Sequence, residues 1–250
     1  MNRDDGLSQV KSRTWFYEFD LPDGTSTTTD VPPSVLPIHT SRRDKLRYVI
    51  DRHVPDAGGL VAYDFASHEG YYTIELARHF RAVCGFEIRP ESLDAAKLIT
   101  DVLQVKNVEY RRADLQKMEY DAEQTADFVL LYGLIYHLEN PVHTLRLASQ
   151  MTRRHILIET QVFPYDIGGM IEDGAYTNQR RLEGVFGLAP DYSWGREGGS
   201  TDIALVPSLN ALLFLMRGFG FTTIEVVQTS NPDYEQFTRG NRVVVYGRKA

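Results

Sequence analysis

The stretch that decides the fold is residues 60–87, which read LVAYDFASHEGYYTIELARHFRAVCGFE. It opens with a compact apolar run from Leu60 that ends in an acid at Asp64. Apolar residues at helical spacing follow over residues 72–80, and a second apolar run from Ala82 again ends in an acid, Glu87. Two short strands separated by one helix predict a parallel pair joined by a helical crossover.

The same alternation continues towards the C-terminus. Asn140-Pro141 supplies an N-cap and a first-turn proline for one helix, and Pro90 suits the first turn of another. Further strands are predicted at residues 108–111, 128–132, 155–159, 222–227 and 242–246, of which the last two pair antiparallel. The sequence therefore predicts an α/β fold with a doubly wound, seven-stranded, mostly parallel sheet and an antiparallel last strand.

Two segments do not show this alternation of strands and helices. Residues 1–40 mix aromatic residues with turn formers and predict an arm, with a short strand or hairpin, that contributes to the substrate site. The main domain is expected to span residues 41–250, with a first helix capped by Ser41. Within it, residues 165–203 are rich in glycine and have no sustained period, which predicts an inserted lid that faces the substrate.

Composition narrows the functional classes. The chain has 250 residues, 42% of them hydrophobic and 24% charged, as in an ordinary globular protein, and its formal net charge is −7. That charge argues against broad, sequence-independent binding of nucleic acid. Cys84 is the only cysteine, which excludes an intramolecular disulfide and leaves this residue as a small buried hydrophobe. Since no secretory signal or membrane-spanning stretch is evident, we expect a cytoplasmic protein that does not bind a membrane.

The loop after the first strand is where a doubly wound sheet binds its ligand. This loop, residues 64–72, has one glycine, Gly70, so it fits neither the dinucleotide nor the Walker phosphate-binding pattern. At the end of the second strand, the carboxylate of Glu87 can accept hydrogen bonds from both hydroxyls of a ribose. Asp114 ends the third strand and can hold an adenine amino group, while Leu115 supplies a backbone amide.

Together these features resemble the class I S-adenosylmethionine-dependent methyltransferases over residues 60–249. The last strand, residues 242–246, matches the antiparallel final strand of that family. Three segments resemble a bacterial subgroup related to the tRNA wobble-uridine carboxymethyl-transferring enzymes: residues 15–24 (WFYEFDLPDG), 69–72 (EGYY) and 131–141 (LYGLIYHLENP). The resemblance implies a Rossmann-like methyltransferase fold with S-adenosylmethionine as cofactor.

Eleven positions are expected to bind that cofactor. They are Asp64, Ala66, His68, Gly70, Tyr71, Tyr72, Glu87, Ile88, Asp114, Leu115 and Tyr132. Ala66 and His68 stand where the family commonly has glycine. Structural roles stay open for several of the others: a helix cap for Asp64, a turn for Gly70, and core packing for the two adjacent tyrosines.

His137 is the catalytic candidate, because it follows the fourth strand and a histidine titrates near neutral pH. The alternative is packing within the loop. The residues expected to contact the substrate are Trp15, Phe16, Tyr136, Arg180, Arg181 and Trp194. The arginine pair can complement a carboxylate or phosphate, or it can be solvated surface. Because only Glu139 provides a further carboxylate near the fourth strand, no metal is predicted.

The predicted activity is methyl transfer to an O, N or C atom of a small aromatic or apolar metabolite by a monomer or homodimer. Two alternatives stay open. One is a methyl or carboxymethyl transferase acting on the wobble uridine of tRNA, against which the net charge of −7 weighs. The other is a non-catalytic module that binds S-adenosylmethionine.

Overall fold

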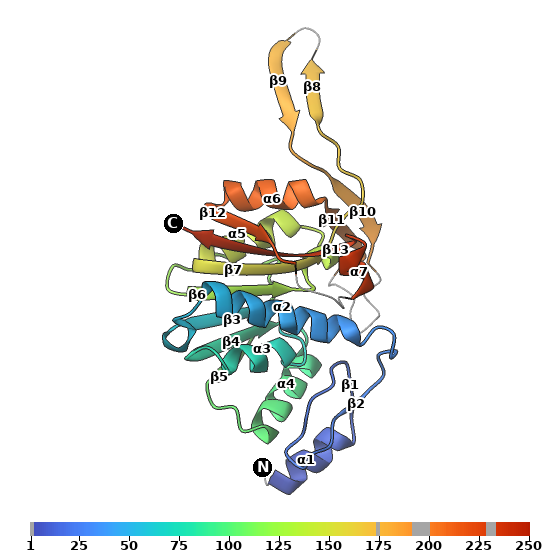
Figure 1. Cartoon of the computed structure of the whole chain (residues 1–250), viewed down its shortest axis with the longest axis vertical. Coiled ribbons are helices and arrows are strands. Elements are labelled where there is room, and N and C mark those ends of the chain that lie inside the picture. Colours follow the sequence, from blue (N-terminus) through green and yellow to red (C-terminus); the bar gives the residue numbers. More distant parts are fainter. Residues whose placement is uncertain (1–2, 174–175, 192–200, 229–233) are drawn as a thin grey trace.

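The computed structural model describes residues 3–173, 176–191, 201–228 and 234–250. Its centre is a seven-stranded sheet in the order β12-β13-β7-β6-β3-β4-β5 (Figure 1). These strands are β3 (Val61–Phe65), β4 (Ala82–Glu87), β5 (Val108–Arg112), β6 (Ala126–Tyr132), β7 (Thr152–Gln161), β12 (Phe221–Val226) and β13 (Arg242–Lys249). The pairs from β7 to β5 are parallel, whereas β13 is antiparallel to both of its neighbours. This sheet confirms the predicted fold.

Helices cover both faces of the sheet. They are α1 (Arg3–Lys11), α2 (Pro37–His53), α3 (Tyr71–Ala77), α4 (Pro90–Val102), α5 (Pro141–Met151), α6 (Leu209–Gly218) and α7 (Glu235–Thr238), with 3-10 turns η1 (Ala57–Gly59) and η2 (Ile135–His137). The remaining strands are β1 (Thr14–Trp15), β2 (Thr28–Thr29), β8 (Gly169–Asp173), β9 (Tyr176–Leu182), β10 (Phe186–Pro190) and β11 (Ile203–Pro207).

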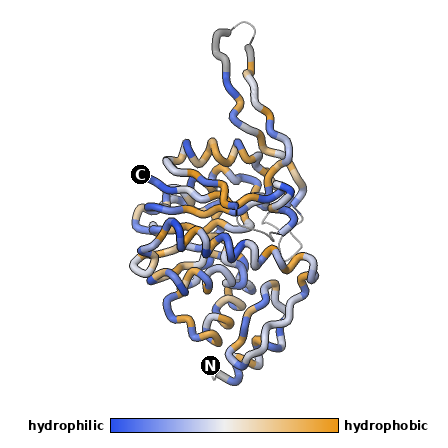
Figure 2. The backbone as a smooth tube through the Cα atoms, viewed as in Figure 1, coloured by the Kyte–Doolittle hydropathy of each residue, from blue (hydrophilic) through white to orange (hydrophobic). Residues whose placement is uncertain are grey.

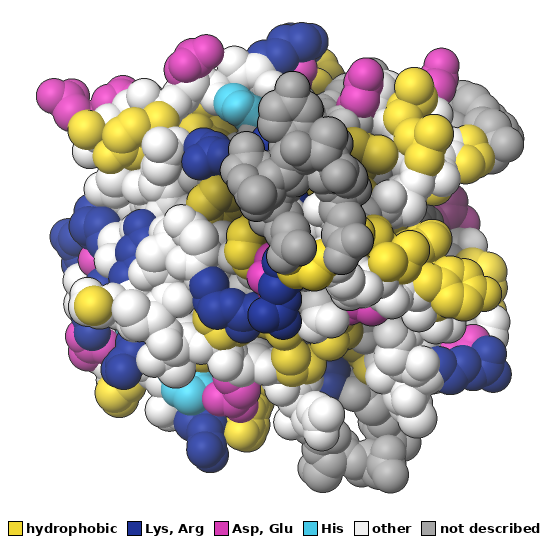
Figure 3. All heavy atoms as spheres, turned by 90° about the horizontal axis from the view of Figure 1, so that it is seen from above, with side chains coloured by type: hydrophobic (Ala, Val, Ile, Leu, Met, Phe, Trp, Pro, Cys, Tyr) yellow, Lys and Arg dark blue, Asp and Glu magenta, His cyan; other side chains and the backbone are white. Residues whose placement is uncertain are grey.

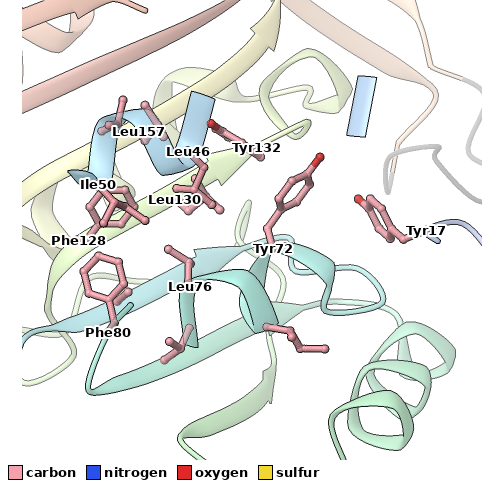
Figure 4. Close-up of a cluster of buried hydrophobic side chains, with 14 of the residues drawn as sticks. Tyr17, Leu46, Ile50, Tyr72, Leu76, Phe80, Phe128, Leu130, Tyr132 and Leu157 are labelled. Carbon is pink, nitrogen blue, oxygen red and sulfur yellow. The ribbon is translucent and has the colours of Figure 1, made fainter. Parts of the chain in front are cut away.

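The core has two layers because successive residues of a strand point to opposite faces. Phe128 and Leu130 of β6 pack against α2, α3 and α4, as the close-up in Figure 4 shows for α2 and the α3 segment. Val129 and Leu131 pack on the other face, against α5 and α6. The central strands are accordingly hydrophobic along much of their length (Figure 2). The sequence of a strand that is buried on both faces is a continuous apolar run, and residues 128–132 have this pattern.

Two helix starts test the predicted caps. The side chain of Asn140 accepts the N–H of His143 at 3.2 Å, which confirms the predicted start of α5. The start predicted at Ser41 is wrong, because α2 begins at Pro37, whose fixed φ suits a first turn. Ser41 lies inside the helix, and its hydroxyl instead accepts the backbone N–H of Tyr234 at 3.1 Å.

The N-terminal arm contains a helix, α1, that was not predicted. The indole N–H of Trp15 donates to the Val10 carbonyl at 2.9 Å, and Trp15 is fully buried. The arm then reaches the first loop of the main domain, where the backbone N–H of Phe16 donates to the Glu69 carboxylate at 2.8 Å. These contacts join the arm to the domain next to the carboxyl ends of the strands.

Residues 165–203, where an inserted lid without sustained periodicity was predicted, contain three strands and the first residue of a fourth among the described residues. β8 and β9 form a hairpin that extends away from the body of the molecule (Figure 1), and β10 pairs antiparallel with β11. Seen from the hairpin end, hydrophobic side chains lie exposed among charged ones (Figure 3). Met170 and Ile171 of the hairpin are about half exposed. Among the described residues, no helix is both long and apolar enough to span a membrane.

Candidate functional site

A cavity of about 300 Å³ lies at the carboxyl ends of β3, β4, β5 and β6. This is where the strand order reverses between β3 and β6, the place where doubly wound sheets bind ligands. Seven of the eleven residues predicted to bind the cofactor line it: Ala66, His68, Glu87, Ile88, Asp114, Leu115 and Tyr132. Asp64, Gly70, Tyr71 and Tyr72 do not.

The Glu87 carboxylate is held rigidly in the cavity wall. One oxygen accepts the N–H groups of Ile88 and Arg89, and the other accepts the N–H of His68, each at 2.9 Å. The residue is 4% exposed. A carboxylate has about four lone-pair positions, so these bonds leave about one for a donor from outside the chain. Glu87 can therefore accept about one hydroxyl hydrogen bond here, whereas its place at the end of β4 predicted bonds from both hydroxyls of a ribose.

Asp114 lies beyond β5 on the same wall. One of its carboxylate oxygens accepts the N–H of Gln116 at 3.1 Å, and the other pairs with the amino group of Lys117 at 2.9 Å. Leu115 beside it is 7% exposed. The carboxylate and the adjoining backbone thus form a polar edge next to an apolar surface, an arrangement that suits a heteroaromatic base.

The loop after β3 has an unusual backbone. Ala66 has φ of 61° and His68 has φ of 49°, both in the left-handed region. That region costs about 1–2 kcal/mol for a residue with a Cβ and almost nothing for glycine. Glycine would therefore suit such positions better, and the loop keeps its path here despite the strain.

Gly70 serves as the N-cap of α3, with φ of 83°. A Cβ at this position would collide with the hydroxyl of Tyr110. Gly70 therefore has the structural role that the sequence analysis left open: it forms the tight turn into α3.

Asp64 is buried beside Gly70 and faces α3. It is 2% exposed, and its carboxylate accepts the Thr73 hydroxyl at 2.5 Å. Burial raises the pKa of Asp64 to about 7, with a smaller contribution from the Glu87 charge, and the Thr73 hydrogen bond opposes the shift. The folded protein therefore favours the neutral carboxylic acid below about pH 7.

Replacing Asp64 with asparagine is expected to stabilise the protein at pH 8 by up to about 4 kcal/mol, since each pKa unit is worth about 1.4 kcal/mol. Below about pH 4 both the folded and unfolded states hold the proton, so the gain vanishes there. It grows as the pH rises towards the folded pKa of about 7, because only the unfolded chain has released its proton in that interval. Urea unfolding of both proteins at pH 4, 6 and 8 measures this gain in the free energy of unfolding.

The matched control is Asp94→Asn, an exposed acid on α4, which is expected to change little at any pH. An Asp64→Asn protein no more stable than the native chain at pH 8 would contradict the raised pKa of Asp64.

The two adjacent tyrosines lie behind the cavity wall. Tyr72 is 5% exposed in the main core cluster, and Tyr71 stacks on Tyr17 with ring centroids 4.8 Å apart. Tyr17, which the sequence analysis did not select, lines the cavity with Phe16. Tyr71 and Tyr72 thus support the arm residues that face the cavity.

His137 also lines the cavity, and its side chain has an acidic partner. Its Nδ1 lies 3.0 Å from a carboxylate oxygen of Asp191, which follows β10 in the inserted segment. Both side chains are largely buried. When Nδ1–H donates to a carboxylate, the imidazole takes the tautomer whose Nε2 carries the lone pair. The pair therefore has the arrangement of an oriented base, and Asp191 was missed because the two residues are far apart in the sequence.

The predicted substrate residues lie in several places. Phe16 and Tyr136 line the cavity, whereas Trp15 lies in the core. Arg180 and Arg181 are exposed on β9, in the hairpin that points away from the body. Trp194 lies outside the described residues.

The sequence analysis also missed a buried charge cluster that reaches the cavity wall through Arg42. A guanidinium nitrogen of Arg42 pairs with Glu159 at 2.8 Å, and Arg242 pairs with the other oxygen of the same carboxylate at 2.7 Å. Arg242 also donates to the Tyr136 hydroxyl at 3.1 Å. Burial raises the pKa of Glu159, but the two guanidinium groups outweigh that effect and hold it below its ordinary value.

Within the described ranges, no group of three or more His, Cys, Asp or Glu side chains is arranged to hold a metal ion.

Comparisons with known proteins agree with this architecture. Residues 63–155 match the model of a methyltransferase domain. A tRNA U34 carboxymethyltransferase of Desulfotalea psychrophila is 26% identical over 180 residues, 71% of this chain and 50% of that protein. The chain thus spans half the length of this curated relative.

Among solved structures, the N-terminal domain of EvdMO1, determined in the presence of SAH and D-fucose, superposes with a TM-score of 0.74. It is 22% identical, and the match covers 100% of this chain and 98% of that one. Magnesium protoporphyrin IX methyltransferase from Synechocystis PCC 6803, with bound SAH, gives a TM-score of 0.59 at 12% identity over 99% and 94% of the two chains. Together with the strand order, the methyltransferase domain match over residues 63–155 and the distant curated relative support a class I S-adenosylmethionine-dependent methyltransferase.

Proposed function

We propose that this enzyme transfers a methyl group from S-adenosylmethionine to an O, N or C atom of a small aromatic or apolar acceptor. The observation that carries the proposal is one cavity that joins a buried strand-end carboxylate, Glu87, to an aromatic wall of Phe16, Tyr17 and Tyr136 with His137 beside it. In this proposal Glu87 recognises the adenosine, and the aromatic wall binds the apolar acceptor.

The residues present fit the cofactor. Glu87 has a lone-pair position left for a ribose hydroxyl, and Asp114 with Leu115 would hold the adenine. S-adenosylmethionine supplies an electrophilic methyl group on a sulfonium centre. The left-handed loop at Ala66 and His68 brings its backbone to the cavity wall.

The chain itself contributes alignment, exclusion of water and a base. The aromatic wall keeps water away from the acceptor and fixes its orientation. Where the acceptor is a hydroxyl or amine, the Nε2 of His137 accepts its proton while Asp191 stabilises the resulting imidazolium. An acceptor that has already lost its proton does not need this step.

Labelled methyl transfer tests the proposal. The protein is incubated with methyl-labelled S-adenosylmethionine and either a small-molecule cell extract or bulk tRNA, with excess S-adenosylhomocysteine as the inhibited control. Label is expected in the small-molecule fraction. Label in tRNA alone would show methylation of tRNA instead, the substrate class named for the Desulfotalea relative. Binding of S-adenosylhomocysteine without labelling of either fraction would favour a non-catalytic module.

A further inference from the structure

Arg42 is a buried cation in the wall of the cavity. It projects from α2, is 6% exposed, and lines the cavity together with Tyr17 and Tyr136. One guanidinium nitrogen is paired with Glu159, but its Nε has no hydrogen-bond partner among the described residues. A buried N–H of a charged group without an acceptor costs more than an unpaired neutral one.

The charges around Arg42 do not balance. Glu159 is shared between Arg42 and Arg242, so the three side chains carry one excess positive charge. His39 next to Arg42 is neutral, since burial, with smaller contributions from Arg42 and His68, lowers its pKa to about 3. Burial also raises the pKa of Tyr17, so that phenol stays protonated. An uncompensated buried charge is costly, and an anion in the cavity would offset it.

The backbone makes room for this guanidinium. Gly133, which follows β6, has φ of 68°, and a Cβ there would lie 3.3 Å from a guanidinium nitrogen of Arg42. The backbone N–H of Gly133 donates to Glu159 at 3.0 Å, so the same residue orients the partner of Arg42. Arg42 is thus held in one position, as a binding group must be.

We propose that Arg42 forms a carboxylate-binding subsite of the cavity. A planar guanidinium with rigid donors matches the geometry of a carboxylate. The proposal rests on the proposed function, because the carboxylate belongs either to the methionyl end of the cofactor or to the acceptor. In both cases the anion accepts from Arg42 and neutralises the excess charge of the cluster.

The first arm of the test compares S-adenosylhomocysteine with 5′-methylthioadenosine, which has the same nucleoside and thioether but no amino-acid end. Calorimetry is done on the native protein, Arg42→Gln and Arg42→Lys. If the cofactor supplies the carboxylate, Arg42→Gln weakens S-adenosylhomocysteine about 10- to 100-fold and leaves 5′-methylthioadenosine unchanged. Arg42→Lys keeps the charge, so its loss is expected to be smaller.

The second arm uses benzoate against benzamide, added to the protein saturated with S-adenosylhomocysteine. If the acceptor supplies the carboxylate, benzoate binds in preference to benzamide, and Arg42→Gln removes that preference while the affinity for S-adenosylhomocysteine stays the same. Arg43→Gln is the matched control. Arg43 neighbours Arg42 on α2, donates to the Tyr71 hydroxyl and does not line the cavity.

Circular dichroism checks that Arg42→Gln and Arg42→Lys are folded. The subsite is refuted if neither folded variant changes the affinity for S-adenosylhomocysteine or the preference for benzoate over benzamide. Failure of the proposed function looks different, because the native protein then binds neither S-adenosylhomocysteine nor 5′-methylthioadenosine. The second arm is in that case repeated on the protein without S-adenosylhomocysteine, where a preference for benzoate that Arg42→Gln removes would still support the subsite.

Discussion

Replacing His137 with alanine is expected to lower turnover about 10²- to 10⁴-fold, the range for loss of a general base. The dissociation constant of S-adenosylhomocysteine is expected to change less than about threefold, because the proposed cofactor recognition depends on Glu87 and Asp114. Steady-state kinetics with the acceptor fraction that takes up label, together with calorimetry, measures both quantities. Equal losses of turnover and cofactor affinity would show that His137 packs the loop and does not act as a base.

His143→Ala is a suitable control, because His143 lies on α5, contacts the Met118 carbonyl and does not line the cavity. Asp191 gives a second check, since its carboxylate orients the imidazole of His137. Asp191→Asn is expected to lower turnover less than His137→Ala does. It is also expected to change the tautomer of His137, which ¹⁵N NMR of the imidazole detects without any acceptor. An unchanged tautomer would show that Asp191 does not orient the imidazole of His137.

The second large effect is expected at Glu87. Glu87→Gln should weaken binding of S-adenosylhomocysteine about 10- to 100-fold, since hydrogen bonds to a charged group are worth about 1.5–3 kcal/mol. The amide keeps the shape of the side chain but replaces one acceptor oxygen by a donor. That donor faces the backbone N–H groups now bonded to the carboxylate, or the ribose. Calorimetry on the purified variant measures the loss.

Glu91→Gln serves as the control for Glu87→Gln, because Glu91 is exposed in the first turn of α4. Its affinity for S-adenosylhomocysteine should match that of the native protein. If Glu87→Gln also binds S-adenosylhomocysteine with native affinity, the adenosine is not held at the end of β4. The assignment of the cofactor site would then be wrong.

Strand-end acids were recognised from the sequence because their positions follow from local patterns. An apolar run that ends in an acid predicts both the strand and the edge at which the carboxylate emerges, as at Glu87. Asp64 shows the limit of that reasoning. It belongs to the same pattern, but its side chain turns towards Thr73 of α3 and is buried away from the cavity.

The arm and the inserted segment were harder to predict. Helix α1 has no pronounced apolar stripe, and part of its support comes from the indole of Trp15, which bonds to its last turn. The hairpin of β8 and β9 has exposed apolar residues on a glycine-rich background, so neither helical nor strand periodicity was evident in advance.

The sequence by itself determined the alternation of strands and helices in the main domain and the two acids at the ends of β4 and β5, because alternation and chain polarity are local properties. Only the tertiary structure decided the partners of His137 and Arg42. Asp191 and Glu159 reach them from segments far along the chain. No local pattern encodes such pairs, since they arise only when separate strands and helices bury their polar groups against one another.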